Sequence, residues 1–327
     1  MNITVVGAGS VGLSLGARLS QAGCNVTMLA RSREAAAALE TKGIEVHDPA
    51  SGERFRARPH VASGWDAIED DGRILLLCVR APDTEEAIGE CARVAPSSVI
   101  ACAQNDVDNE GCAARIFERV IGVVVRQTCT RTDFHTTNAL GTGRIIVGAY
   151  TDAARDPALR LGAGFASAGY DVGVSQDIAA DKWLKLCVNL MSVPNAVIKP
   201  EEHTTPDFIE IKARILEEAR DALAAAGIRA ESCDGRDRSL EDEIAFQRAS
   251  VERGVSARRL PVYNAVWGSL RHGSALEADL YHQRVLDLAA AYNLRTPMNQ
   301  RALDLLVQAQ REQRGPESFH CADFLES

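Results

Sequence analysis

A glycine-rich turn near the N-terminus has the residue types and spacing of a phosphate-binding site. It has the sequence Gly7-Ala8-Gly9-Ser10-Val11-Gly12 and lies between a short β-branched run and a helical pattern. In such a unit the first glycine allows the tight turn and the second lets the backbone approach a pyrophosphate. The third lets helix and strand pack closely, and the helix N-terminus receives the phosphate charge. The glycine pattern alone is weak evidence for a dinucleotide site. Its place in the first βαβ unit strengthens it, and together they predict a dinucleotide site formed by these six residues.

The end of the second predicted strand indicates which dinucleotide is bound. A site that prefers NAD usually carries an acid there, which binds the ribose 2′-hydroxyl. This chain has Leu29-Ala30-Arg31-Ser32-Arg33 and no acid. Arg31 can lie against a 2′-phosphate, with Ser32 or Arg33 adding a hydrogen bond. Solvated arginines at the start of a helix are the alternative, and the missing acid favours NADP(H).

Strand and helix patterns alternate around this turn. Residues 74–79 form a continuous apolar run, the pattern of a strand buried on both faces of a parallel sheet. A polar, alternating stretch at 43–61 suggests a hairpin-like excursion. Further strands are expected at 2–6, 25–29, 98–103, 120–125 and 142–148, and helices at 33–42, 84–94, 110–117 and 153–168. The alternation predicts a doubly wound α/β domain of the Rossmann type.

The strand signals stop near residue 175, and the remaining pattern is helical. Helices are expected at 177–196, 205–226, 238–251, 260–285 (broken) and 297–312, and the polar end at 313–327 is expected to be loosely held. The predicted organisation is an NADP-binding Rossmann domain at 1–174 and an all-α domain at 175–327. The second domain would bind the substrate, and it offers a surface for a homodimer without identifying which helix face.

Composition narrows the class of protein. The 327 residues favour two domains. The net charge of -9 argues against an electrostatic nucleic-acid binder, and no apolar run is long enough to span a bilayer. Nine cysteines without a C-x-x-C pair indicate free thiols in a reducing compartment, so a cytoplasmic protein is expected. The seven histidines show no metal-ligand spacing, and no metal is expected.

Four further segments, in order along the chain, resemble motifs of the ketopantoate reductases. The similar segments are Leu77–Thr84 ("V-K-x-x-D-T"), Gln104–Glu110 ("Q-N-G-x-G-N-E"), Asp181–Asn189 ("W-x-K-L-x-x-N") and Leu276–Asp279 ("T-E-I-D"). Each motif alone is modest, but the ordered set is specific and spans most of the chain. The fold of that family, a Rossmann domain followed by an all-α domain, agrees with the pattern described above.

The resemblance implies reduction of a 2-oxo acid, ketopantoate, to pantoate by hydride from NADPH. Lys185 matches the catalytic lysine of the family. A ketone that becomes an alkoxide needs a proton or a positive charge at its oxygen, and an ammonium group supplies both. Lys182, one helical turn earlier, is the competing candidate, and the "K-L-x-x-N" setting favours Lys185.

The resemblance also implies roles for polar residues elsewhere. Asn189 would hydrogen-bond the substrate, and Asn105 would contact both the nicotinamide ribose and the substrate; an Asx turn that caps the next helix is the alternative for Asn105. Glu277 matches a glutamate on the cofactor side of the cleft, with a solvated helix face as its alternative. Arg80 replaces a lysine and keeps its positive charge near the cofactor. Ser269 is a candidate for binding the substrate carboxylate, although its spacing to Glu277 is shorter than the family's.

Three residues depart from the family pattern on the substrate side. Val193 stands where a second asparagine is usual, and Asp106 and Asp108 replace glycines beside a site for anions. One alternative is therefore an enzyme of the same architecture that acts on another 2-oxo acid, carbonyl or alcohol. Another is a non-catalytic NADPH-binding sensor, against which the ordered presence of Lys185, Asn189 and Asn105 argues.

Overall fold

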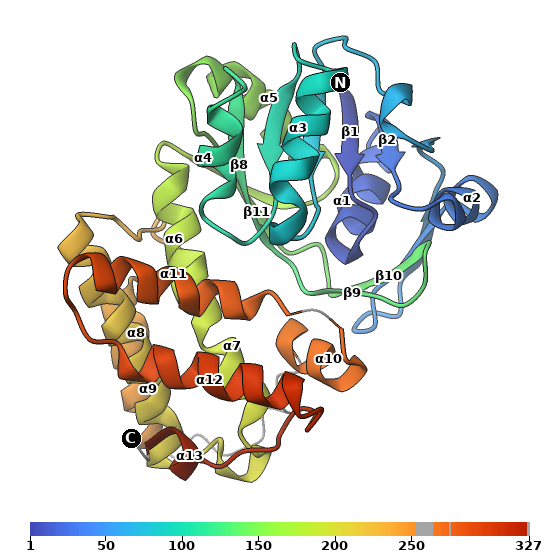
Figure 1. The fold of residues 1–327 in the computed structure, drawn as a ribbon. Coiled ribbons are helices and arrows are strands. Elements are labelled where there is room, and N and C mark those ends of the chain that lie inside the picture. Colours follow the sequence, from blue (N-terminus) through green and yellow to red (C-terminus); the bar gives the residue numbers. More distant parts are fainter. Residues whose placement is uncertain (253–263, 275, 326–327) are drawn as a thin grey trace. The chain divides into compact units, whose positions relative to one another are not determined.

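The computed structural model describes residues 1–252, 264–274 and 276–325 (Figure 1). The chain forms two compact units, Met1–Lys182 and Trp183–Ser327. The division falls inside helix α6 (Ile178–Leu190), later in the chain than the boundary expected at residue 174.

An eight-stranded sheet forms the centre of the first unit, in the order β12-β11-β8-β7-β6-β1-β2-β5. Its strands are β1 (Asn2–Val6), β2 (Asn25–Leu29), β5 (His60–Ala62), β6 (Ile74–Leu77), β7 (Val99–Cys102), β8 (Val120–Arg126), β11 (Arg144–Ala149) and β12 (Asp171–Ser175). All neighbouring strands of this sheet pair in parallel except β8 and β11. The strand order reverses between β1 and β6, and ligands of such sheets bind outside the carboxyl ends of the strands at this point. The predicted doubly wound α/β fold is confirmed.

Helices cover both faces of this sheet. They are α1 (Ser10–Gln21), α2 (Arg33–Lys42), α3 (Thr84–Val94), α4 (Asn109–Ala114) and α5 (Arg155–Ser167). Successive residues of β1 face opposite layers, because side chains alternate along a strand. Val5 belongs to the buried cluster that includes residues of α1 and α5, whereas Val6 belongs to the cluster with α3 and α4. This two-sided burial explains why the central strands β6 and β7 are apolar at every position.

A second, four-stranded sheet lies beside α1, in the order β4-β3-β10-β9. Its strands are β3 (Ile44–His47), β4 (Arg54–Ala57), β9 (Cys129–Arg131) and β10 (Thr136–Ala139). The antiparallel pair of β3 and β4 confirms the hairpin expected within 43–61. No pattern predicted β9, β10 or β12. These strands are short, and the pairing of β10 with β3 joins segments far apart in the sequence.

The second unit is helical throughout its described residues, apart from an isolated bridge between Ile198 and Phe319. Its helices after α6 are α7 (Ser192–Val197), α8 (Pro206–Ala226), α9 (Leu240–Glu252), α10 (Ala265–His272), α11 (Ala278–Ala291), α12 (Pro297–Arg311) and α13 (Cys321–Leu325). The helix expected at 177–196 is therefore two helices, α6 and α7. The broken helix expected at 260–285 corresponds to α10 and α11, while 260–263 and 275 lie outside the described residues. Within the described ranges, no helix is both long and apolar enough to cross a membrane.

The expectation of a loosely held C-terminal end is wrong for its final helix. The side chains of Phe319 and Phe324 are buried, with 3% and 0% exposure. The backbone of this segment is also fixed, because the Lys199 amide donates to the Phe319 carbonyl at 3.0 Å. Two aromatic side chains in a polar segment are enough to anchor it, since each buries a large apolar area.

A buried polar network joins α8, α11 and α12. His282 of α11 is fully buried, and its Nδ1 lies 2.9 Å from Oδ1 of Asn299 at the start of α12. Asn299 Nδ2 donates to a carboxylate oxygen of Glu218 at 2.8 Å. The Glu218 carboxylate also accepts from the amides of Met298 and Asn299, each at 2.9 Å. Burial lowers the pKa of His282 from 6.5 to about 4, and its hydrogen bonds only partly oppose this.

This pKa predicts acid sensitivity. Between pH 6.5 and about 4 the unfolded chain binds a proton at His282 that the folded chain does not. The free energy of unfolding should therefore fall as the pH is lowered from 6.5 to about 4, and His282 contributes at most about 3 kcal/mol of this loss. Urea unfolding at several pH values should show that the free energy of unfolding depends less steeply on pH in His282→Asn than in wild type. The asparagine keeps a donor for Asn299 but does not titrate. Burial raises the pKa of Glu218, an effect of opposite sign that both proteins share. Equal pH dependence in the two proteins would contradict the prediction.

Candidate active site

The glycine-rich turn has the geometry that its spacing predicts. Gly7 has a φ of 108°. A Cβ there would lie 3.0 Å from the backbone carbon and oxygen of Cys78, the residue that follows β6. A Cβ on Gly12 would lie 2.0 Å from the Gly7 carbonyl oxygen, which no side chain could tolerate. Gly9 precedes α1, and its carbonyl accepts the first helical hydrogen bond, from Leu13, at 2.9 Å. Only glycine fits the first and third positions.

This turn fits the phosphates of a dinucleotide. The first amides of α1, beginning with Ser10 and Val11, have no acceptor within the helix and carry the positive end of its dipole. Ala8, Gly9, Ser10 and Val11 are only half-buried, so a ligand can reach their backbone. The turn also lies between β1 and α1, at the carboxyl edge of the sheet. Residues 7–12 can therefore hold a pyrophosphate by backbone contacts alone.

Two predicted cofactor residues, Arg31 and Arg80, meet at one carboxylate. Arg31 Nη1 lies 3.4 Å and Arg80 Nη2 3.5 Å from Oδ2 of Asp83. Both contacts are long, and the Arg31 side chain is 81% exposed, so water weakens the pairing. The two guanidinium groups therefore keep donors for an anion. The Ser32 hydroxyl caps α2 by accepting from the Ala35 amide at 3.2 Å, and its O–H can still donate to an anion.

The loop that carries Asn105 is held by a buried lysine. Lys182 Nζ donates to the carbonyl oxygen of Gln104 at 2.7 Å and lies 3.5 Å from that of Asp106, so it engages the backbone on both sides of Asn105. The same Nζ lies 2.6 Å from Oε1 of Glu110. Both side chains of this ion pair are almost fully buried, at 3% and 2% exposure. Asn105 itself is half-buried at the carboxyl end of β7.

These contacts decide what Lys182 can do. An ammonium group has three N–H donors, and the two carbonyls and the carboxylate occupy them. Burial raises the pKa of Glu110, while the nearby ammonium opposes that shift. A lysine enclosed in this way fixes the 104–110 loop and has no donor left for a substrate. These contacts give Lys182 a structural role, and the catalytic role expected of Lys185 stays a prediction.

The acidic residues of this loop differ from the expectation of two acids beside an anion site. Asp106 is 4% exposed, and its Oδ1 accepts from the Val107 amide at 2.8 Å. Its carbonyl accepts from Asn109 Nδ2 at 3.0 Å. Asp108 is exposed, just before α4. Only one of the two carboxylates is therefore at the surface of the loop.

Other predicted site residues belong to the second unit, where they lie on helices α6, α7 and α10. Lys185 and Asn189 are half-buried and lie one turn apart on the same face of α6. Val193 of α7 is fully buried, and its apolar side chain offers no hydrogen bond. Ser269 is half-buried on α10.

Asn264 attaches α10 to α7. Its Nδ2 donates to the Ser192 carbonyl at 2.8 Å, and its Oδ1 accepts from the Trp267 amide at 2.9 Å. Helix α10, which carries Ser269, is therefore held against α7. Helix α7 directly follows α6, which carries Lys185 and Asn189. Glu277 stands apart in the chain, at the position before α11.

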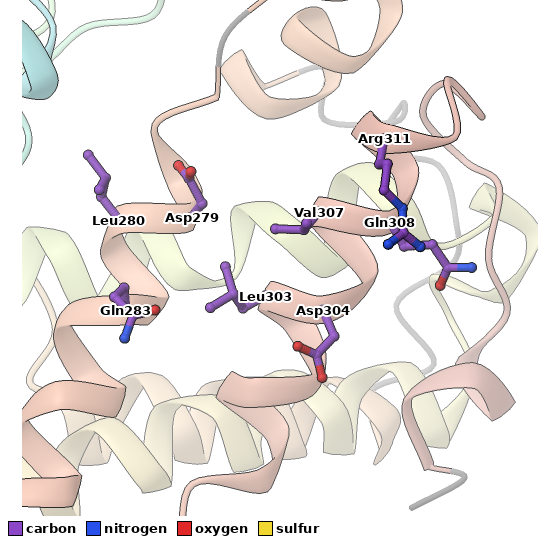
Figure 2. A pocket seen from close by; sticks show the side chains of 8 residues that line it. All are labelled: Asp279, Leu280, Gln283, Leu303, Asp304, Val307, Gln308 and Arg311. Atoms are coloured by element: carbon purple, nitrogen blue, oxygen red, sulfur yellow. The ribbon is translucent and has the colours of Figure 1, made fainter.

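A hollow occurs among the described residues of each unit. The larger, about 600 Å³, lies between α11 and α12 (Figure 2) and is lined by Asp279, Leu280, Gln283, Leu303, Asp304, Val307, Gln308 and Arg311. The smaller, about 360 Å³, lies near the start of α5 and the end of β12, where Tyr150, Arg155 and Ser175 are among its lining residues. The residues predicted from motifs as site residues line neither hollow.

Sequence reasoning missed the partners that orient the predicted residues. Asp83 and Glu110 both fall within motifs that resemble the reductases, but only their position in the motif was visible. Their roles depend on side chains from other segments, Arg31 and Lys182. Glu110 is the second residue of α4, and only the structure shows that this acid is buried opposite a cation.

Comparison with known proteins agrees with the motif resemblance. Residues 3–152 match the family described as "Ketopantoate reductase PanE/ApbA". A 2-dehydropantoate 2-reductase of Pyrococcus horikoshii is 20% identical over 309 residues, covering 91% of this chain and 94% of that protein. A PanE/ApbA family ketopantoate reductase from Ralstonia eutropha JMP134 has a similar structure, with a TM-score of 0.75 at 20% identity over 96% of this chain and 100% of that one.

A ternary structure of D-mandelate dehydrogenase with NADH and anilino(oxo)acetate shares the fold as well. Its TM-score is 0.77 at 16% identity, over 96% of this chain and 100% of that one. The family resemblance and the class of enzyme expected from the sequence are confirmed by these matches. Residues 3–152 of this chain therefore match the family of ketopantoate reductases PanE/ApbA, and over most of its length the chain is similar to the 2-dehydropantoate 2-reductases, which are oxidoreductases.

Proposed function

We propose that this protein reduces a 2-oxo acid with NADPH, and that the substrate is 2-dehydropantoate, which becomes pantoate. The observation that carries the proposal is the glycine turn of residues 7–12 with Arg31, and no acid, at the end of β2. That arrangement suits a nicotinamide dinucleotide with a 2′-phosphate. The names of the relatives supply the substrate class. In this proposal residues 1–174 bind the cofactor, and residues 175–327 bind the substrate and form a homodimer.

The predicted residues then take separate roles. The bound cofactor supplies the hydride. Lys185 holds a proton for the substrate oxygen and donates it as negative charge develops there. Asn189 and Asn105 hydrogen-bond the substrate, and Lys182 keeps the Asn105 loop in place through its carbonyls.

The remaining polar residues bind and orient. Arg80 contributes charge on the cofactor side, where Asp83 orients it together with Arg31. Glu277 contacts the cofactor, and Ser269 binds the substrate carboxylate.

The test is oxidation of NADPH followed by its absorbance, with 2-dehydropantoate and a panel of other 2-oxo acids, each repeated with NADH. We expect turnover of 2-dehydropantoate with NADPH and a kcat/KM at least about tenfold lower with NADH, since one charge-assisted contact to the 2′-phosphate is worth roughly that factor. Binding of NADPH without turnover of any 2-oxo acid would reject the enzyme and support a sensor.

A second candidate is the same reaction on a different 2-oxo acid. It is favoured by Val193, which is fully buried and apolar where the family usually offers an asparagine. A site built without that polar group should accept a less polar substrate better, because a hydrogen bond to the missing amide cannot form. Preference for an apolar or aromatic 2-oxo acid over 2-dehydropantoate in the panel would select this candidate.

A further inference from the structure

The four-stranded sheet brings an arginine to the glycine-rich turn. Strands β9 and β10 pair antiparallel, with Arg131 directly opposite Thr137. The Thr137 hydroxyl donates to the carbonyl oxygen of Ser10 at 3.2 Å, and Arg131 Nη1 donates to that of Ala8 at 3.4 Å. The two contacts lie on either side of Gly9. This strand pair is therefore attached to the turn itself.

The charge of Arg131 is not neutralised there. Among the described residues, its guanidinium donates to the Ala8 carbonyl and lies 5.8 Å from the centroid of the Phe134 ring. Among the residues that the structure describes, no carboxylate pairs with it, whereas Arg31 and Arg80 share Asp83. The side chain is exposed. A guanidinium has five N–H donors, so most of them are available to an anion at this turn.

We propose that Arg131 binds the pyrophosphate of the dinucleotide. The pyrophosphate of such cofactors lies at the glycine turn, which Arg131 touches, whereas the 2′ position of the ribose lies at the end of β2, which carries Arg31. The planar fork of an arginine suits two phosphate oxygens at once. Arg131 therefore adds charge to a cradle that otherwise consists of backbone amides. This inference rests on the dinucleotide of the proposed function, but not on its substrate.

The division of labour between the two arginines gives a specific test. The dissociation constants of NADPH and NADH are measured by the fluorescence of the bound nicotinamide, using the full chain without substrate. Arg131→Gln should raise both constants by a similar factor, roughly tenfold, because both dinucleotides carry the pyrophosphate. Arg31→Gln should raise the constant for NADPH and leave that for NADH near wild type. Arg131→Lys should fall between wild type and Arg131→Gln, since it keeps the charge without the fork.

The control is Arg160→Gln, an exposed arginine on α5, which should change neither constant. Melting temperatures of all variants should match wild type, because each replaced side chain is exposed. Unchanged constants in Arg131→Gln would overturn the inference, as would a loss confined to NADPH, which would place Arg131 at the 2′-phosphate. Failure of the wild-type protein to bind either dinucleotide would instead reject the cofactor of the proposed function, and the inference with it.

Discussion

Replacing Lys185 by alanine should lower kcat by about 10²- to 10⁴-fold, the usual contribution of a positioned general acid. The dissociation constant of NADPH should stay near wild type, because the proposed cofactor contacts are made by residues 7–12 and Arg31. Lys185 is suited to the role because it is half-buried on α6. Steady-state kinetics and NADPH titration of the same preparations would measure both quantities.

Two further variants separate the proton from the charge. Lys185→Arg keeps the charge but cannot give up a proton near neutral pH, so a kcat as low as that of Lys185→Ala would show that the proton is needed. Lys42→Ala, at the exposed end of α2, is the matched control and should leave kcat unchanged. A Lys185→Ala variant that retains most of its activity would mean that another group or water protonates the substrate.

Replacing Lys182 by methionine should lower the free energy of unfolding by about 3–5 kcal/mol, the cost of leaving one member of a buried ion pair alone. Glu110 is 2% exposed and 2.6 Å from the Lys182 ammonium, so no water can replace the lost partner without rearrangement. The carbonyls of Gln104 and Asp106 lose their donor at the same time. Urea unfolding of the variant against wild type would measure the loss.

The double variant Lys182→Met/Glu110→Gln gives the internal control for this prediction. Removing both charges should recover part of the stability lost in Lys182→Met, since no unpaired charge remains. The loss in the single variant should also shrink as the pH falls. Burial raises the pKa of Glu110 and the ammonium of Lys182 opposes that shift, so loss of the ammonium makes this carboxyl easier to protonate and thereby to neutralise. Equal losses in the single and double variants at all pH values would show that the ion pair contributes nothing specific.

The outcome for Lys182 shows where motif reasoning reached its limit. Both lysines of α6 lie in the same segment, and spacing alone left them in competition. The structure separates them because Lys182 faces the end of β7 and is enclosed by Glu110 and two carbonyls. Those partners come from a loop more than seventy positions earlier in the chain. No local pattern could show that one of the two ammonium groups has no donor left.

Features that depend on neighbouring residues were predictable from the sequence. The turn at residues 7–12 requires glycine for steric reasons that act within one βαβ unit, and the apolar run at 74–79 indicates a doubly covered strand. Helix α8 is similarly local: Thr205 caps its first turn and Gly227 ends it in the left-handed conformation. Each of these signals is complete within a few residues, which is why the order of elements in the Rossmann unit and the helical character of the rest were predictable.

Contacts between side chains that are far apart in the sequence could be found only in the folded structure. The strand pair of β9 and β10, the meeting of Arg31 with Arg80 at Asp83, and the docking of Phe324 all join segments far apart in the sequence. Strands of three or four residues carry too little pattern to reveal a partner, and a charged side chain carries none. The free energy that fixes such contacts comes from burial and from the removal of water between groups, and both exist only once the chain has folded.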